Sequence, residues 1–188
     1  MQQLGCENRV RRRCLPGHSV STRGPERLPA RNGGVTAFKF RDPDGHPLEL
    51  IQFPPGQGRP VWQHAGGNGL SSGPFLGIDH SAMTVAATPR SLRFYRRLGV
   101  RVTARSLNDS PAQSRLDGVP GARVLVTGLR FSAPASPGLE LLCYTPPGRP
   151  APVVGANAAV TDWVKLSGRR AAVRRDPDGH IMLLAGEH

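Results

Sequence analysis

One carboxylate of this sequence lies in strongly apolar surroundings and therefore needs a chemical explanation. Glu140 stands in the stretch "GLELLCY" at 138–144, whose pattern predicts a β-strand. Successive side chains of a strand point to opposite faces, so Glu140 shares its face with Leu142 and Tyr144. A carboxylate in such a position costs free energy unless it has a partner, and either a metal ion or an arginine would serve. Glu140 is therefore a candidate site residue.

His80 is the second side chain with suitable chemistry. It lies in "FLGIDHSAMTV" at 75–85, which is also typical of a strand and places His80 on one face with Ile78 and Ala82. A histidine in such a strand is either a hydrogen-bonded core residue or a ligand that faces a cavity, and the residues alone leave both interpretations open. His46 and His180 each follow a turn, where a solvent-facing or hairpin role is the simplest interpretation.

Other sequence features exclude several classes of protein. No phosphate-binding P-loop and no dinucleotide-binding GxGxxG motif occurs. Cys6, Cys14 and Cys143 fit neither a disulfide framework nor a zinc site, so we expect a reducing, cytoplasmic environment. The sequence has no run of about 18 apolar residues, so we expect no membrane span, and the basic N-terminus lacks the apolar region of a secretory signal.

The positive charge of the chain raises the question of a nucleic-acid partner. The formal net charge is +12, and all but two of the 25 basic residues are arginines. These arginines are scattered, and no basic stripe interleaved with aromatic residues and no helix-turn-helix pattern accompanies them. We therefore expect nonspecific adhesion to polyanions rather than a specific nucleic-acid function.

The hexapeptide "RDPDGH" occurs twice, at 41–46 and at 175–180, each time between two apolar stretches. Asp-Pro-Asp-Gly has the composition of a tight turn, because Asp can bond the backbone, Pro fixes φ and Gly accepts a left-handed conformation. The flanking stretches predict a β-hairpin around each copy. Six identical residues with matching flanks indicate a duplicated unit rather than a coincidence.

Composition divides the chain into four segments. Residues 1–32 are basic and without strand or helix period, so we expect them to be disordered. Residues 33–56 contain the first hairpin, and residues 57–75 are rich in Gly and Pro, as is typical of a linker. Residues 76–188 form the main domain. The chain is therefore expected to belong to the α+β class.

The main domain is predicted to begin with the order β-α-β-β-β. The helix is expected at 88–99, "TPRSLRFYRRLG", where Thr88 suits the N-cap, Pro89 the first helical position and Gly99 the residue after the C-cap. Strands precede and follow this helix, and residues 107–121 are expected to form a loop before the last two strands. No convincing helix is predicted in the remainder of the domain.

Several of these stretches together resemble the vicinal oxygen chelate superfamily, which includes glyoxalase I, bleomycin-resistance proteins, fosfomycin-resistance enzymes and extradiol dioxygenases. They are "GIDHSAMTV", "SLRFYRRLGVRV", "GLELLCYTPP", "RDPDGHIMLL" and the earlier "FKFRDPDGHPLELIQF". The resemblance implies paired βαβββ modules that form a curved, partly open barrel around a cavity. It also implies that the second module is degenerate and that the first hairpin is the remnant of a preceding domain. We therefore expect a truncated or misassigned start.

The resemblance also implies a set of metal ligands. Metal-using members present two histidines and two glutamates from four strands, and His80 and Glu140 match the first two positions. The third position has no histidine, and Asp162 is the only carboxylate near it. The fourth position follows the hexapeptide, where the first copy has Glu49 and the second has Leu183. The implied metal ligands are thus His80, Glu140 and Glu49.

Three functions remain open at this point. The first is a lyase, isomerase or dioxygenase that uses a divalent ion such as Fe, Ni, Zn or Mn, with Glu140 also in a catalytic role. The second is a metal-free protein that binds a small molecule, as in bleomycin resistance, and the third is an inactive truncated member. In each case we expect a cytoplasmic homodimer with a small-molecule ligand, no specific nucleic acid and no membrane.

Overall fold

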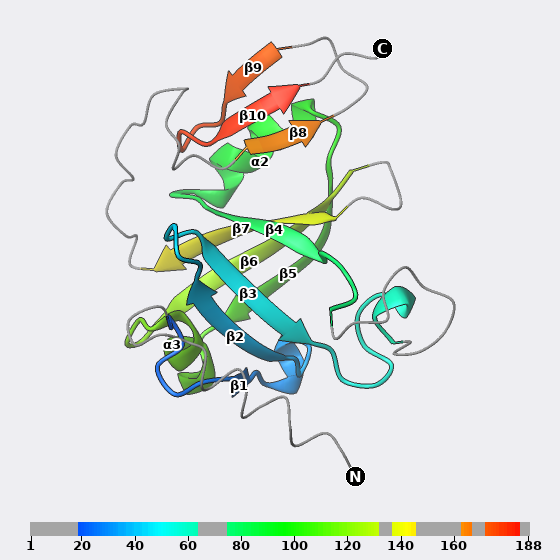
Figure 1. The fold of residues 1–188 in the computed structure, drawn as a ribbon. Helices are drawn as coiled ribbons and strands as arrows, with labels where there is room; N and C mark the ends of the chain where they lie inside the picture. Colours follow the sequence, from blue (N-terminus) through cyan, green and yellow to red (C-terminus); the bar gives the residue numbers. More distant parts are fainter. Residues whose placement is uncertain (1–18, 64–74, 132–136, 146–162, 167–171, 185–188) are drawn as a thin grey trace. The chain divides into compact units, whose positions relative to one another are not determined.

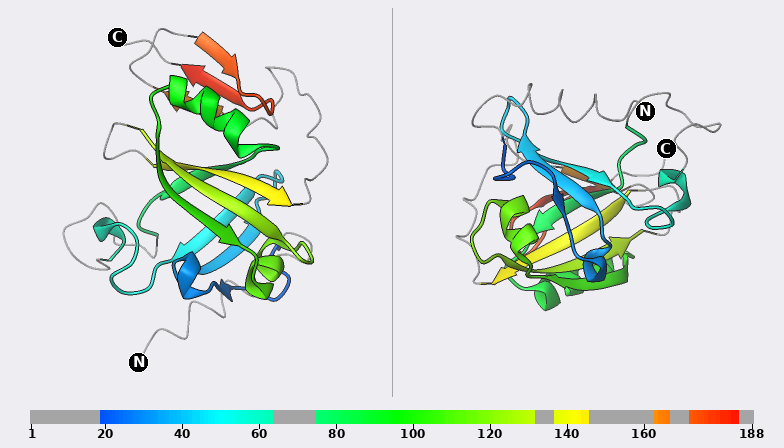
Figure 2. Two further views of the ribbon diagram at one scale, coloured as in Figure 1. Left: turned by 180° about the vertical axis from the view of Figure 1, so that it is seen from behind. Right: turned by 90° about the horizontal axis from the view of Figure 1, so that it is seen from below.

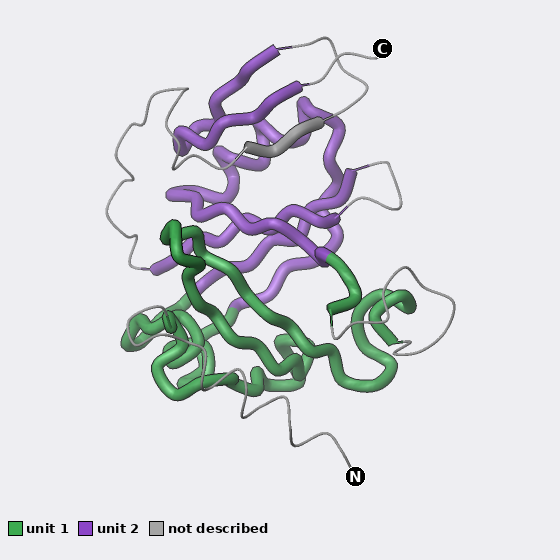
Figure 3. Tube along the Cα trace, viewed as in Figure 1, with its two compact units in different colours: residues 1–77, 108–123 green, residues 78–107, 124–188 purple. Residues whose placement is uncertain are grey.

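The computed structural model describes residues 19–63, 75–131, 137–145, 163–166 and 172–184 (Figure 1). These residues form two compact units (Figure 3). Unit 1 comprises residues 1–77 and 108–123, and unit 2 comprises residues 78–107 and 124–188. The architecture is α+β with mixed sheets, as the sequence predicts.

Unit 2 is built on a four-stranded sheet. Its elements are β4 (His80–Thr84), α2 (Thr88–Arg97), β5 (Arg101–Asn108), β6 (Arg123–Arg130) and β7 (Gly138–Thr145). The strand order is β4-β7-β6-β5, and the first strand runs parallel to the last. The predicted β-α-β-β-β order is confirmed, with one added helix between β5 and β6.

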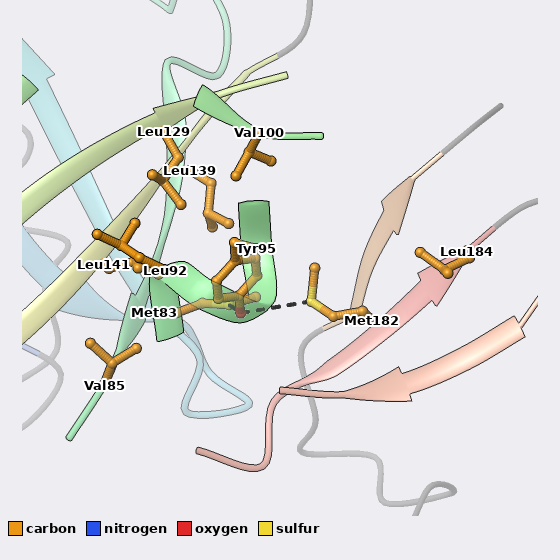
Figure 4. Close-up of a cluster of buried hydrophobic side chains, with 10 residues drawn as sticks. All are labelled: Met83, Val85, Leu92, Tyr95, Val100, Leu129, Leu139, Leu141, Met182 and Leu184. Carbon is orange, nitrogen blue, oxygen red and sulfur yellow. Dashed lines mark hydrogen bonds between the residues drawn. The ribbon is translucent and has the colours of Figure 1, made fainter. Parts of the chain in front are cut away.

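One face of this sheet packs on α2 (Figures 1 and 2). The buried cluster drawn in Figure 4 comprises Met83, Val85, Leu92, Tyr95, Val100, Leu129, Leu139, Leu141, Met182 and Leu184. Because strand side chains alternate between faces, the residues between these buried ones lie on the opposite face of the sheet. His80, Glu140 and Arg130 therefore face away from α2.

Unit 2 also contains a three-stranded sheet, with β8 (Trp163–Leu166), β9 (Ala172–Arg175) and β10 (Ile181–Leu184). Its order is β8-β10-β9, and β8 runs parallel to β10. This repeats the relation of β4 to β7, in which the first strand of the module also lies beside the last. The region from 146 to 162, where we predict no helix, lies outside the described residues.

The repeated hexapeptide forms the same turn in both copies. The first Asp accepts hydrogen bonds from two backbone N–H groups, at 3.0 and 2.9 Å in Asp42 and at 2.9 and 2.8 Å in Asp176. The preceding Arg donates to the Gly carbonyl, and the Gly has a φ of 90° at Gly45 and 96° at Gly179. The Arg, the first Asp and the Gly of the turn therefore have the same local function in both copies.

The second turn also joins β9 and β10 to α2. Asp178 accepts a hydrogen bond from the Ala86 N–H at 3.1 Å and another from the Ser91 hydroxyl at 2.8 Å. We predicted Thr88 as the N-cap of the helix. Thr88 is instead the first residue of α2, and the N-cap residue, Ala87, makes no side-chain hydrogen bond. The carboxylate that serves the start of α2 instead lies far along the sequence, so the local sequence could not reveal it.

Asp176 lies beneath this turn with a fully buried side chain. Its Oδ2 accepts hydrogen bonds from the Tyr95 hydroxyl at 2.7 Å and from His180 Nδ1 at 3.0 Å. Burial raises the pKa of Asp176, but the hydrogen bonds from His180 and Tyr95 outweigh it and hold that pKa below its ordinary value. Burial and the Asp176 charge raise the pKa of Tyr95, so its hydroxyl stays protonated and donates.

Unit 1 contains β1 (Glu26–Arg27), β2 (Thr36–Arg41), β3 (Pro47–Gln52), two short 3₁₀ helices at Ala30–Asn32 and Pro60–Trp62, and α3 (Pro111–Asp117). β2 and β3 form the predicted hairpin. Two expectations are wrong in part. Residues 19–32 are structured rather than disordered, and the expected loop at 107–121 contains α3. The expected linker contains the second 3₁₀ helix.

The structure of α3 and of β1 depends on contacts across unit 1. Arg115 donates two hydrogen bonds of 2.7 Å to the Glu26 carboxylate. Lys39 Nζ lies 2.6 Å from Asp117 Oδ1. Leu116 of α3 is buried against Leu28 and other apolar residues of the hairpin region. These partners are about 80 to 90 residues away in the sequence, so a local pattern does not show them.

The two turns provide a matched pair of variants. Asp178→Ala is expected to lower the free energy of unfolding by about 1–3 kcal/mol, because it removes the acceptor of two hydrogen bonds at the start of α2. Asp44→Ala is expected to change it by less than about 0.5 kcal/mol, since its exposed carboxylate accepts no hydrogen bond from the described residues. Urea unfolding followed by circular dichroism measures both, and equal effects would contradict the role of Asp178.

Asp176 gives a prediction for the pH dependence of stability. A carboxylate with a lowered folded-state pKa stabilises the fold above its unfolded-state pKa of about 4, and this contribution is lost as the pH falls through the folded-state value. Asp176→Asn should therefore lower the free energy of unfolding at pH 7, and its difference from wild type should shrink from about pH 5 to about pH 2. A difference that stays constant in urea unfolding over this range would contradict the prediction.

Candidate functional site

The pairing of β4 with β7 brings His80 and Glu140 together. The two strands are parallel, with Ala82 opposite Glu140 and His80 opposite Gly138. His80 and Glu140 are thus diagonal neighbours on the face that points away from the core. His80 Nε2 lies 3.4 Å from Glu140 Oε2. The structure therefore places two of the three predicted metal ligands in contact.

Asp79 orients the His80 ring. Its Oδ2 lies 2.9 Å from His80 Nδ1, and an ionised carboxylate can only accept, so Nδ1 carries the proton and donates. This leaves Nε2 directed at Glu140. Histidines that bind metals commonly donate their other nitrogen to a carboxylate in this way. No role for Asp79 was predicted from the sequence, although its position directly before His80 was the available signal for this contact.

The site is partly open to solvent. The side chains of His80, Asp79 and Glu140 are 15, 23 and 29% exposed. At this depth solvent screens the charge of the Glu140 carboxylate less than it would at a fully exposed surface.

The spacing of the two ligand atoms fits a divalent ion. Two atoms that each lie about 2.1 Å from one ion at a tetrahedral angle are about 3.4 Å apart. His80 Nε2 and Glu140 Oε2 have this separation. Imidazole nitrogen and carboxylate oxygen are also the donor types that Zn, Fe, Ni and Mn accept. These two residues therefore fit two positions of a metal site.

Glu49, the third predicted ligand, belongs to unit 1 rather than unit 2. It lies on β3 opposite Lys39, whose Nζ is 3.9 Å from Glu49 Oε2. Leu183 lies opposite Val173 in the same register of the second hairpin, which confirms that the two positions correspond. Asp162 lies outside the described residues.

The first hexapeptide holds another group of candidate ligands. One ligand atom from each of Asp42, Asp44 and His46 lies within 4.8 Å of the others, and the group is partly exposed. The Asp42 carboxylate accepts hydrogen bonds from Asp44 N, His46 N and His46 Nδ1. The second copy makes the same hydrogen bonds, so they belong to the turn, as predicted for His46 and His180. The group offers suitable oxygen and nitrogen atoms to a cation, but the turn itself accounts for its arrangement.

Arg130 is a further residue that sequence reasoning missed. A Cβ at Gly138 would lie 3.4 Å from His80 Cβ and 3.7 Å from the guanidinium carbon of Arg130. These are ordinary contact distances, so His80 and Arg130 both lie against the same position of β7. The nearest available signal was Gly138 itself, because a glycine at the start of a strand often marks a close approach.

Comparison with known proteins concerns the fold. No protein-family model and no curated protein matches the sequence. Among solved structures, a glyoxalase family protein from Bacillus cereus matches with a TM-score of 0.52 at 17% identity, over 62% of this chain and 97% of that one. The chain has a glyoxalase-like fold. The resemblance to the vicinal oxygen chelate superfamily noted in the sequence is consistent with this match, which at such identity concerns architecture alone.

The membrane expectation can also be compared with the structure. Among the described residues, no helix has the length and apolar character needed to cross a bilayer.

The orienting contact of Asp79 predicts an effect on metal affinity. Asp79→Ala should weaken Zn²⁺ binding about 10–100-fold, because the His80 ring loses the acceptor that fixes its orientation. Competition with a chromophoric chelator measures this affinity. Asp44→Ala removes a carboxylate from the turn group and serves as the control that should bind like wild type. Equal affinity of Asp79→Ala and wild type would show that Asp79 does not orient a metal ligand.

Proposed function

We propose that this protein is a divalent-metal-dependent enzyme of the glyoxalase type that acts on a small organic substrate. The reaction would be a lyase, isomerase or dioxygenase reaction, with His80, Glu140 and Glu49 as ligands. The observation that supports it most is the contact of 3.4 Å between His80 Nε2 and Glu140 Oε2 on the open face of a glyoxalase-like sheet. Asp79 supports it further, because it fixes the ring of His80.

A bound divalent ion would supply Lewis-acid polarisation of a substrate oxygen. The residues of the chain provide the remaining functions. His80 and Asp79 hold one nitrogen lone pair in a fixed direction, and Glu140 offers a carboxylate oxygen that can accept a proton from the substrate. The core face of β4 and β7 keeps both strands rigid, since Met83, Leu139 and Leu141 are buried there. Rigid strands hold catalytic groups more accurately than loops do.

The remaining ligand positions need a source outside His80 and Glu140. Glu49 has the right chemistry and the position in its hairpin that the resemblance implies. Water or a second subunit would be the other sources, and we propose a homodimer as the assembly in which a second copy contributes. Leu183 occupies the corresponding place in the second hairpin and has no ligand atom.

Leu183 also favours the second candidate function, a metal-free protein that binds a small molecule on the same face of the sheet. In such a protein a doubly protonated His80 forms an ion pair with Glu140 instead of a metal site. Variants separate the two functions. Glu140→Ala abolishes metal retention and turnover in the enzyme, whereas it leaves ligand affinity largely intact in the binding protein. An inactive truncated member would show neither.

The test of the proposal is metal content by elemental analysis. The purified wild-type protein is compared with His80→Ala/Glu140→Ala, and with Asp44→Ala/His46→Ala as a control for the turn group. We expect a divalent ion in wild type and in the control, but not in the first variant. Wild type that stays metal-free after reloading with Ni²⁺, Zn²⁺, Fe²⁺ and Mn²⁺ would contradict the enzyme. Metal lost only in the control would assign the ion to the turn.

A further inference from the structure

The face of the four-stranded sheet that carries His80 and Glu140 is rich in arginine. Residues of β5 and β6 alternate between the core and this face, and Val102 and Leu129 pack in the core cluster. The side chains one position away from them therefore point to the open face. They include Arg101, Thr103, Gly128 and Arg130.

Among these residues, Arg130 lies nearest to the proposed reaction site. Its guanidinium carbon is 3.7 Å from the place where a Gly138 Cβ would be, and His80 Cβ is 3.4 Å from the same place. Arg130 and His80 thus flank one glycine on adjacent positions of the sheet. A guanidinium has five N–H donors in a planar fork, more than one carboxylate uses, so it can bind a further oxyanion.

A second glycine, Gly128, also leaves this part of the face without a side chain. A Cβ at Gly128 would lie 3.2 Å from the Thr103 hydroxyl, which is closer than side chains ordinarily pack. A glycine inside a strand weakens the strand, and its presence is typical of a place where another group approaches the backbone closely. By strand alternation, Gly128 lies on the same face of β6 as Arg130, and Gly138 lies on the same face of β7 as Glu140.

The charges on this face indicate the sign of the ligand. Arg101 and Arg105 are exposed on β5, at the other edge of the sheet, whereas Arg130 of β6 lies near His80. Asp79 and Glu140 supply the negative charges in contact with His80, so Arg130 is the cationic group nearest to them among the arginines of this face. Arginine binds carboxylate and phosphate groups in a bidentate manner, which orients a small ligand as well as attracting it.

We propose that Arg130 binds the anionic group of the substrate and thereby sets its class, a small organic acid with a carboxylate or a phosphate beside the oxygen atoms presented to His80 and Glu140. The part of this inference that concerns the oxygen atoms presented to His80 and Glu140 rests on the proposed function. The anion contact itself requires no metal. It can therefore be measured separately in metal-free protein.

The test is the affinity of the full-length protein for two probes, glycolate and inorganic phosphate, in the presence of a chelator. Nuclear magnetic resonance titration at fixed ionic strength gives both dissociation constants. Arg130→Met keeps most of the side-chain stem and removes the charge. It should raise the dissociation constant of the preferred probe by about tenfold or more. Arg97→Met removes an exposed charge from α2, on the other side of the sheet, and should bind like wild type.

A second variant separates local contact from net charge. Arg130→Lys keeps the charge but removes the planar fork of donors, and it should also weaken probe binding. Loss with glycolate alone identifies a carboxylate substrate, and loss with phosphate alone identifies a phosphorylated one. Equal binding by wild type and Arg130→Met, or equal loss in Arg130→Met and Arg97→Met, would overturn the proposal.

The outcome is independent of the test for the enzyme. Metal content is measured on the same Arg130→Met protein and should equal that of wild type, because Arg130 is not a ligand. Anion binding that depends on Arg130 in a protein that never holds metal would retain this inference and refute the metal-dependent function. Metal binding without an effect of Arg130 would do the reverse.

Discussion

The parallel pairing of β4 with β7 is the constraint on which the rest of unit 2 depends. It places Met83, Leu139 and Leu141 on one face, where they are buried with α2. The same alternation places His80 and Glu140 on the other face, diagonal to one another and in contact. A shift of one residue in this register would expose the core and bury the candidate ligands at the same time. The pairing of these two strands therefore fixes both the core and the positions of the candidate ligands.

The repeated hexapeptide shows how one local structure serves two contexts. In both copies the first Asp closes the turn through backbone N–H groups and a histidine. Only in the second copy do further carboxylate contacts join the turn to α2, through Asp178 and through the Tyr95 hydroxyl on Asp176. The conserved composition of the two copies thus reflects the turn itself, whereas their different surroundings decide what else each carboxylate does. The turn therefore accounts by itself for the compact arrangement of Asp42, Asp44 and His46.

The sequence permits prediction of features that depend on local pattern. The alternation in each strand shows which side chains share a face with His80 and with Glu140, and Pro89 and Gly99 mark the helix between the two strands. That the two residues belong to one site was implied by the resemblance alone. Features that depend on distant partners could not be predicted. α3 has seven residues and is stabilised by Glu26 and Lys39 of the N-terminal hairpin region, and the start of α2 depends on Asp178. The proximity of Arg130 to His80 likewise arises only because β4, β7 and β6 lie side by side.

The central claim is that His80 and Glu140 bind one ion together. Anomalous diffraction from crystals of the full-length protein soaked in Zn²⁺ tests this most directly. We expect an anomalous peak about 2.0–2.2 Å from both His80 Nε2 and a Glu140 carboxylate oxygen. A peak at Asp42, Asp44 and His46, with none at His80, would contradict the claim and would leave the open face of the sheet as a metal-free binding surface.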